Sequence, residues 1–144
     1  MKVREILQTK GSEVATIRPD SNVSTAASLL KLKGVGALVV SADGSHVDGI
    51  LSERDIVRGL VDHEREIMDL PVADLMTSTV RTCHLGADIT EVMSEMTRGR
   101  IRHLPVIEDS ELCGIISIGD VVKNRLDELE TESGALRDYI VGKI

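Results

Sequence analysis

One seven-residue pattern, Gly-x-x-Ser-x-x-Asp, occurs twice and holds the clearest chemical groups of this chain. The copies are Gly49–Asp55 and Gly114–Asp120, displaced by a constant 65 residues (114 − 49 = 65 and 120 − 55 = 65). A serine followed three residues later by an acid is typical of a helix capping box, in which both side chains accept hydrogen bonds from backbone N–H groups. The pattern therefore predicts that each copy begins a helix.

The same geometry would also suit a nucleoside. A helix start presents free N–H groups and the positive end of the helix dipole. A carboxylate can accept hydrogen bonds from both hydroxyls of a ribose, as the acid of dinucleotide-binding folds does. Each copy could thus hold one nucleoside, with apolar strand residues around the base. Because a cap alone explains the serine and the acid, both interpretations remain open at this point.

A cationic segment supports a phosphate close to the second copy. Residues 98–103 contain three arginines and a histidine, although the chain carries a net charge of −7. Arginine pairs with phosphate through two parallel hydrogen bonds. Arg102 and His103 directly precede a predicted strand, and Arg54 is a further candidate cation. A solvated basic patch is the alternative. The first copy has glycines at the corresponding place, so we expect the two sites to differ.

Composition excludes several classes of protein. The 144 residues include one tyrosine and no phenylalanine or tryptophan, so the core must be aliphatic. An acidic chain without stacking aromatics is not typical of a nucleic-acid binder. No apolar run approaches the roughly 20 residues of a membrane helix, and the start has no apolar signal core, which favours a cytoplasmic protein. Cys83 and Cys113 are interpreted as two reduced, packed thiols.

Hydrophobic periodicity predicts two copies of one unit, strand–helix–strand–strand–helix, each preceded by a short helix. The expected short helices cover residues 1–8 and 72–76; the strands 14–17, 37–40 and 47–51, then 80–83, 104–107 and 112–116; the middle helices 23–33 and 88–99, ended by Gly34 and Gly99. Further helices follow Asp55 and Asp120, and the connection over 62–71 is partly helical. Each copy is small, so we expect both to pack sheet to sheet around one shared core. The last helix should reach Tyr139 or beyond, its Leu126, Leu129, Leu136 and Ile140 covering the core or a partner.

With these features the chain resembles a tandem pair of CBS domains (named after cystathionine β-synthase), often called a Bateman module. The resemblance covers nearly all of residues 1–128 and rests on the duplicated motif, on Asp74-Leu75-Met76-Thr77 and on Arg102-His103-Leu104-Pro105-Val106. The two motifs further resemble those of small stand-alone CBS-pair proteins. The resemblance implies an α+β fold of two β-α-β-β-α repeats packed sheet to sheet with pseudo-two-fold symmetry. It implies repeat 1 over 1–66, repeat 2 over 67–128 and a C-terminal helical extension over 129–144.

The resemblance also implies a set of ligand-binding positions. Asp55 and Asp120 would hold ribose hydroxyls, with Ser52 and Ser117 near ribose or phosphate. The adenine pocket would be lined by Thr16, Ile17, Thr82 and Cys83, and its opposite wall by Ala37, Leu38, His103 and Leu104. Arg102 and His103 would reach phosphates. Ile118 and Gly119 depart from the polar residues of the first copy, so the contacts of the second site are less well defined.

The function implied is a non-catalytic regulatory module that binds an adenine nucleotide and senses energy or redox state. AMP is the first candidate ligand, and ADP, ATP and NAD(H) share its adenosine part; the partners would be a second copy and an unknown effector protein. A ligand-free homodimeric interaction module is the alternative. An enzyme is the least favoured interpretation, because adjacent strand residues such as Cys83 and His84 point to opposite faces. The histidines are scattered without metal-ligand spacing, so no metal site is predicted.

Overall fold

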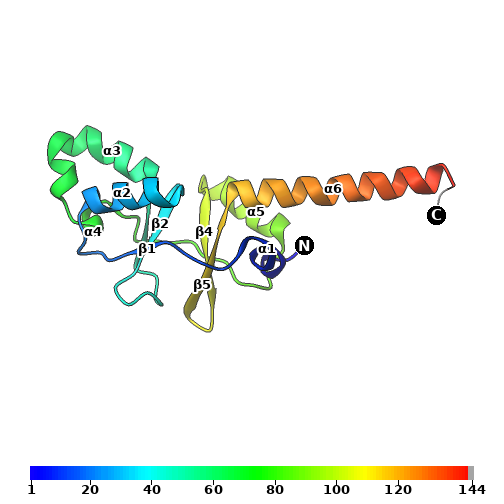
Figure 1. Ribbon diagram of the computed structural model, residues 1–144, viewed down its shortest axis with the longest axis horizontal. Helices are drawn as coiled ribbons and strands as arrows, with labels where there is room; N and C mark the ends of the chain where they lie inside the picture. The colour runs from blue at the N-terminus through cyan, green and yellow to red at the C-terminus, as the bar shows by residue number, and fades with distance from the viewer. Residues whose placement is uncertain (143–144) are drawn as a thin grey trace.

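The computed structural model describes residues 1–142, which form two small sheets and six α-helices (Figure 1). The first repeat contains β1 (Thr16–Ile17), α2 (Val23–Lys33), β2 (Ala37–Val40), β3 (Gly49–Ser52) and α3 (Glu53–His63). The second contains α5 (Ile89–Gly99), β4 (His103–Glu108), β5 (Glu111–Ser117) and α6 (Ile118–Ile140). The helices α1 (Val3–Lys10) and α4 (Val72–Leu75) precede the repeats, and the 3₁₀ helix η1 (Glu64–Asp69) makes the connection partly helical, as predicted.

The two sheets differ at one edge. In the first, β1 pairs in parallel with β2, which pairs antiparallel with β3. In the second, the antiparallel hairpin β4–β5 stands alone, so the strand predicted over 80–83 is wrong. Only Cys83 pairs there: its N–H donates to the Pro105 carbonyl oxygen at 3.0 Å. Beyond Cys83 the chain runs to α1, where the carbonyl oxygen of Leu85 accepts a hydrogen bond from the N–H of Arg4.

Each repeat has its own core, completed by the helix that precedes the other repeat. Val3, Ile6 and Leu7 of α1 pack with buried residues of α5, β4, β5 and α6. Val72 of α4 packs with buried residues of β1, α2, β2 and β3. The predicted single shared core is therefore replaced by two cores. The short helices cross between repeats, and this exchange ties the two repeats together.

The glycine of each motif makes room for that crossing. A Cβ atom on Gly114 would lie 2.6 Å from Cδ1 of Leu7, and one on Gly49 would lie 2.6 Å from Sδ of Met76. Leu7, within α1, and Met76, directly after α4, occupy corresponding places, each four residues after the first residue of its helix (7 − 3 = 4 and 76 − 72 = 4). Both distances are too short for a real side chain, so only glycine lets the crossing segment pack this closely. The capping box alone did not explain why both motifs begin with glycine.

Helix α6 reaches Ile140, as predicted for the last helix, and projects beyond the rest of the molecule (Figure 1). Leu126, Leu129, Leu136 and Ile140 are all exposed, so the first of the two predicted alternatives, that they cover the core, is wrong. The second alternative, contact with a partner, stays a prediction. Within residues 1–142, none of the helices combines the length and the apolar character that crossing a bilayer requires.

Candidate functional site

Both motifs form the predicted capping boxes. At the start of α3, the Oδ2 atom of Asp55 accepts hydrogen bonds from the N–H of Ser52 at 2.8 Å and from its hydroxyl at 3.1 Å. At the start of α6, the N–H of Ser117 donates to Oδ2 of Asp120 at 2.9 Å, and the N–H of Asp120 donates back to the Ser117 hydroxyl at 3.2 Å. The acids are thus fixed by the helix starts themselves, before any ligand is considered.

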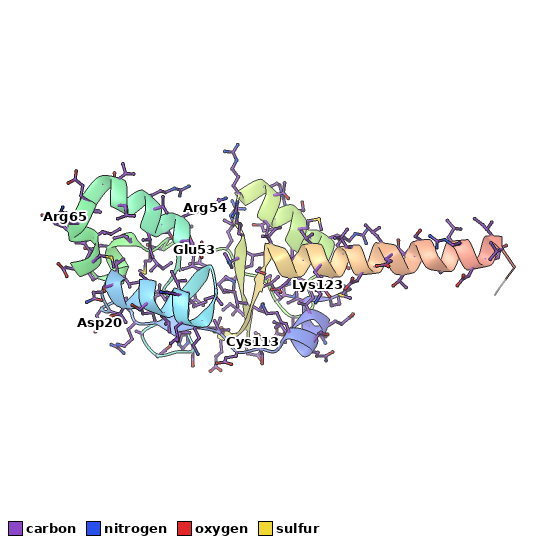
Figure 2. All side chains as sticks on the ribbon, turned by 45° about the horizontal axis from the view of Figure 1, so that its top comes forward. Asp20, Glu53, Arg54, Arg65, Cys113 and Lys123 are labelled. Atoms are coloured by element: carbon purple, nitrogen blue, oxygen red, sulfur yellow. The ribbon has the colours of Figure 1, made fainter. Side chains whose placement is uncertain are left out.

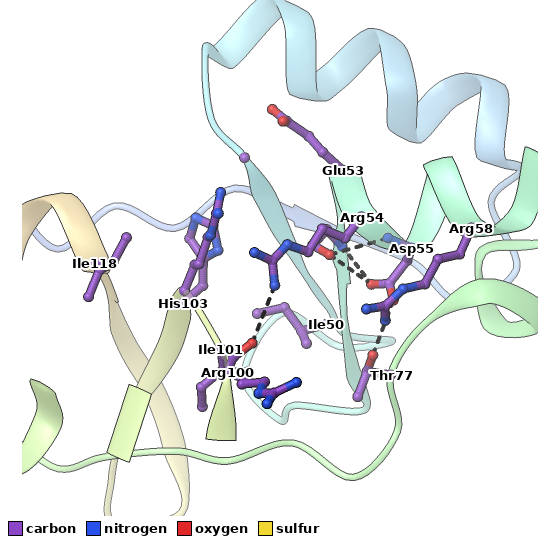
Figure 3. Close-up of a pocket in the computed structure, with 13 residues that line it drawn as sticks. Ile50, Glu53, Arg54, Asp55, Arg58, Thr77, Arg100, Ile101, His103 and Ile118 are labelled. Carbon is purple, nitrogen blue, oxygen red and sulfur yellow. Dashed lines mark hydrogen bonds between the residues drawn. The ribbon is translucent and has the colours of Figure 1, made fainter. Parts of the chain in front are cut away.

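A cleft of about 340 Å³ opens at the first of these helix starts, between the two repeats (Figure 3). Its volume lies in the range of small-molecule sites, which begins at roughly 300 Å³. Five residues predicted from the sequence line it together: Ser52, Arg54, Asp55, Arg102 and His103. The other lining residues are Gly36, Ile50, Glu53, Arg58, Thr77, Arg100, Ile101 and Ile118. Both repeats therefore contribute to one cavity.

Positive charge dominates this cleft. Arg54 and Arg58 come from the first turns of α3, and Arg100 and Arg102 from the segment that leads into β4. Only two carboxylates, those of Glu53 and Asp55, share the lining with these four guanidinium groups. The guanidinium of Arg54 donates to the carbonyl oxygen of Arg100 at 3.4 Å, so it reaches from one repeat to the other (Figure 3). The arrangement suits an anion such as a phosphate.

Asp55 also presents an oxygen towards the cleft. Its Oδ1 atom accepts a hydrogen bond from the Thr77 hydroxyl at 3.3 Å. Thr77 is held there by two backbone hydrogen bonds with Ile50, of 3.0 and 2.9 Å. A carboxylate oxygen can accept a second hydrogen bond. Asp55 is thus oriented by the cap on one side and by the crossing segment on the other, and it keeps capacity for a ligand hydroxyl.

His103 contributes a neutral ring to this wall. Burial, which disfavours the charged form, is the largest influence and holds its pKa below the ordinary value for histidine. The ring lies against Gly36 of the other repeat, where an added Cβ atom would be 3.3 Å from Cε1. His103 can therefore offer a hydrogen bond to a ligand at neutral pH, whereas the charge of the cleft comes from the arginines.

The second motif differs from the first in that an internal cation pairs with its acid. Lys10, at the end of α1, donates to Oδ2 of Asp120 at 2.6 Å and to the carbonyl oxygen of Ile115 at 2.9 Å. Burial raises the pKa of Asp120, but the hydrogen bonds from Lys10 and Ser117 together outweigh it and hold the pKa below its ordinary value. Asp120 stays ionised and paired, while Asp55 in the corresponding place meets the neutral hydroxyl of Thr77.

The remaining predicted site residues lie apart from this cleft. Leu38 and Leu104 are fully buried in the two cores, and Ala37 is nearly so. Thr16 and Ile17 line a shallow groove beside α2. Thr82 is exposed, and Cys83 packs against the second core. A ligand in the cleft would meet Gly36, Ile50 and Ile101 instead.

Some cleft residues that were not predicted carried a signal in the sequence. Arg58 follows Arg54 by four residues, the spacing of side-chain neighbours on one helix face. Arg100 alternates with Arg102 in the cationic segment. Thr77 carried none, because its place depends on the crossing of the segment after α4.

Cys83 is unsuited to nucleophilic chemistry. Burial against the second core raises the pKa of its thiol to about 12. The thiolate is the reactive form of cysteine, so this side chain is protonated and inert at neutral pH. This thiol therefore gives no support to the enzyme interpretation.

Arg100 adopts a backbone conformation that favours glycine. Helix α5 ends at Gly99, and Arg100 follows as the left-handed cap with φ of 52°. The residue predicted to end the helix, Gly99, is therefore one position too early. Gly34, with φ of 64°, is the left-handed cap of the first repeat, and it corresponds to Arg100 (100 − 34 = 66). Leu38 corresponds to Leu104 by the same shift (104 − 38 = 66). A non-glycine residue in the left-handed conformation costs roughly 1–2 kcal/mol of stability. The helix cap at Arg100 is therefore strained, and the same residue supplies one of the cations of the cleft.

We expect Arg100→Gly to stabilise the protein and to weaken anion binding in the cleft. The substitution relieves the strain, but glycine also gives the unfolded chain more conformational entropy, which opposes folding. The net gain in the free energy of unfolding should be about 0.5–1 kcal/mol. Urea unfolding followed by circular dichroism measures the gain, and titration with AMP measures the loss. Gly34→Arg is the reciprocal control, expected to destabilise by a similar amount. An unchanged or lower stability of Arg100→Gly would contradict the strain.

Comparison with known proteins identifies the family. The CBS domain model matches residues 3–62 and 72–127. A mitochondrial CBS domain-containing protein of Arabidopsis thaliana is 35% identical over 127 residues, which span 85% of this chain but 62% of that relative. An uncharacterized 17.7 kDa protein of Acidianus ambivalens is 31% identical over 142 residues, spanning 94% of this chain and 85% of the relative.

Solved structures agree. A CBS-domain containing protein of Agrobacterium tumefaciens superposes with a TM-score of 0.84 at 41% identity, covering 87% of this chain and 99% of the other. The CBS domain pair of protein MJ0100, solved with 5′-methylthioadenosine and S-adenosyl-L-methionine, has a TM-score of 0.76 at 22% identity, over 85% of this chain and 98% of that one. The latter shows likeness of fold alone. This chain belongs to the CBS-domain family and carries two CBS domains in tandem.

Proposed function

We propose that this protein is a regulatory module that binds one adenine nucleotide per chain, AMP foremost, in the cleft between its repeats. The observation that carries the proposal is the set of four guanidinium groups from both repeats around the oriented carboxylate of Asp55. The arginines would hold a phosphate, and Asp55 would accept from the ribose hydroxyls. Ile50 and Ile101 would contact the base.

The proposal assigns one site, not two, because the motifs differ in what faces the acid. Asp55 faces Thr77 and an open cleft, whereas Asp120 is already neutralised by Lys10. A ribose at Asp120 would have to displace a charged partner at 2.6 Å. Support from the family is general: the CBS pair of protein MJ0100 was solved with two adenosyl compounds, so this fold can accommodate such groups.

The regulatory step would use the link between repeats. Arg54 already joins α3 to the backbone of Arg100, and a phosphate between these arginines would change how the two repeats are held. A ligand can shift such an equilibrium only by its difference in affinity for the two arrangements. The output would pass to an effector protein in the cytoplasm, where AMP, ATP or NAD(H) would report energy or redox state.

The proposal is tested by calorimetric titration of nucleotide-free protein with AMP, ADP, ATP, NADH and GMP. We expect micromolar binding of at least one adenine ligand with a stoichiometry of one per chain, and much weaker binding of GMP. Raising the salt concentration should weaken the binding of AMP, because the attraction between its phosphate and the arginines is screened by salt. A stoichiometry of two would contradict the assignment of a single site.

An interaction module without a ligand remains the second candidate function. The specific observation in its favour is the exposed apolar side of α6, which needs a protein partner and no nucleotide. Absence of binding for all five nucleotides would favour this function over the sensor.

A further inference from the structure

An exposed apolar stripe runs along the projecting helix α6. Its members recur at alternating steps of four and three residues, and all but the serine are large and apolar: Val122, Leu126, Leu129, Ser133, Leu136 and Ile140. Leu126 and Leu136 are each 60% exposed and Ile140 is 73% exposed. Steps of four and three are the spacing of the buried seam of a two-stranded coiled coil. We refer to these six residues as the α6 seam.

The outer half of α6 has little support from its own chain. Figure 2 shows side chains standing out from this part of the helix with no other element beside them. Gly134 lies in its middle, and an added Cβ atom there would meet nothing within 4 Å. Glycine in a helix interior is unfavourable, and isolated short helices are marginal in water. A covered seam would supply the stability that this projecting helix lacks.

The charges that flank the seam select the partner. In a parallel, in-register pair of such helices, the residues just before seam positions 126 and 133 each face the residue five places later on the other chain. These pairs join Arg125 to Glu130 and Glu132 to Arg137 of the second copy, and both are attractive. In an antiparallel pair centred on Thr131, Glu130 would lie close to Glu130 and Glu132 close to Glu132 of the other chain, and both contacts are repulsive.

We propose that the α6 seam is the contact surface for a second copy of this chain, joined as a parallel two-stranded coiled coil. A two-fold axis along α6 makes the interface self-complementary, as closed dimers require. This interface goes beyond the nucleotide site and does not depend on it. Ser133 is the one polar seam position, and it lowers the strength of the seam without changing its register.

Charge exchange tests the proposal at residues that are exposed and far from either core. Glu132→Arg and Arg137→Glu each place like charges across the dimer. Each should raise the dimer dissociation constant about tenfold, because a symmetric dimer contains every pair twice. The double variant Glu132→Arg/Arg137→Glu should return to the wild-type value. Analytical ultracentrifugation of the full chain measures all three.

Cysteine cross-linking tests orientation. Ile140→Cys should form a disulfide dimer under mild oxidation, because parallel helices bring position 140 opposite itself. Asp138→Cys, two residues away on the outer face, is the matched control and should not. A monomeric wild-type chain, a dimer indifferent to the charge variants, or cross-linking of Ile140→Cys only to Val122→Cys would each overturn the proposal.

Discussion

Replacement of Gly114 by alanine should destabilise the fold by about 1–3 kcal/mol, the usual cost of inserting atoms into a packed core. The new methyl group would lie 2.6 Å from Cδ1 and 3.0 Å from Cδ2 of Leu7. Leu7 is only 6% exposed and is surrounded by the second core, so it has little room to move. Urea unfolding at fixed pH, with the slope of the transition checked for constancy, measures the loss.

The double variant Gly114→Ala/Leu7→Ala identifies the cause of that loss. Leu7→Ala alone should cost roughly 2–5 kcal/mol, because it leaves a cavity where α1 meets the second core. The methyl group on residue 114 would partly fill that cavity, so the two changes together should cost less than their sum. Gly134→Ala is the control, since it lies in a helix with open space around it and should stabilise by about 1 kcal/mol. Additive losses would contradict the close approach of α1.

Replacement of Gly49 by alanine should also destabilise the first repeat. The new methyl group would meet Sδ of Met76 at 2.6 Å, whose unbranched side chain can adapt, and the backbone carbonyl oxygen of Thr77 at 3.0 Å, which is held by its hydrogen bond with Ile50. The difference between the two glycines therefore reports the stiffness of the crossing segment. It also gives the repeated glycine a structural role that holds whether or not a nucleotide binds.

Local chemistry explains what the sequence predicted well. The serine and acid of each motif do form capping boxes, and Gly34 ends α2 as predicted. Strong apolar periodicity placed the central strands and the long helices. These features depend on residues within a few positions of each other, so a single sequence is enough to predict them.

Features that depend on distant segments were not predictable in this way. The exchange of α1 and α4 between repeats brings Leu7 to Gly114 and Thr77 to Asp55, and no local pattern encodes that crossing. The same crossing brings Lys10 into an ion pair with Asp120. The two motifs therefore differ in structure although they are alike in sequence. The edge strand at 80–83 fails for a related reason, since the chain there turns to meet α1.

The cationic segment shows how structure divides one sequence feature. Arg98 is 73% exposed, pairs with Glu95 at 3.4 Å and lies outside the cleft. Arg100, Arg102 and His103 of the same segment line the cleft. A run that reads as a single basic patch is thus split by the end of α5 into a surface ion pair and a wall of the candidate site. This split supplies a matched pair of variants.

Arg102→Gln should weaken AMP binding by about 10- to 100-fold, the loss of a charge-assisted hydrogen bond of roughly 1.5–3 kcal/mol. Adenosine lacks the phosphate, so its affinity should change less than threefold, on the order of a neutral contact. The backbone carbonyl of Arg102 accepts from the N–H of Ile118 at 2.8 Å, and the substitution leaves that anchor in place. Paired titrations with AMP and adenosine separate loss of phosphate recognition from general disturbance of the cleft.

Arg98→Gln is the control for that experiment, because it removes the same charge a few residues away without touching the cleft. It should leave the affinity for AMP within about twofold, since exposed charges are strongly screened at physiological salt. Equal losses for AMP and adenosine in Arg102→Gln would show that residue 102 supports the shape of the site and does not bind phosphate. Equal losses in Arg98→Gln and Arg102→Gln would assign the effect to the overall field of the segment. Only selective loss in Arg102→Gln fits a phosphate held between the two repeats, which is the arrangement that a sensor of phosphorylated nucleotides requires.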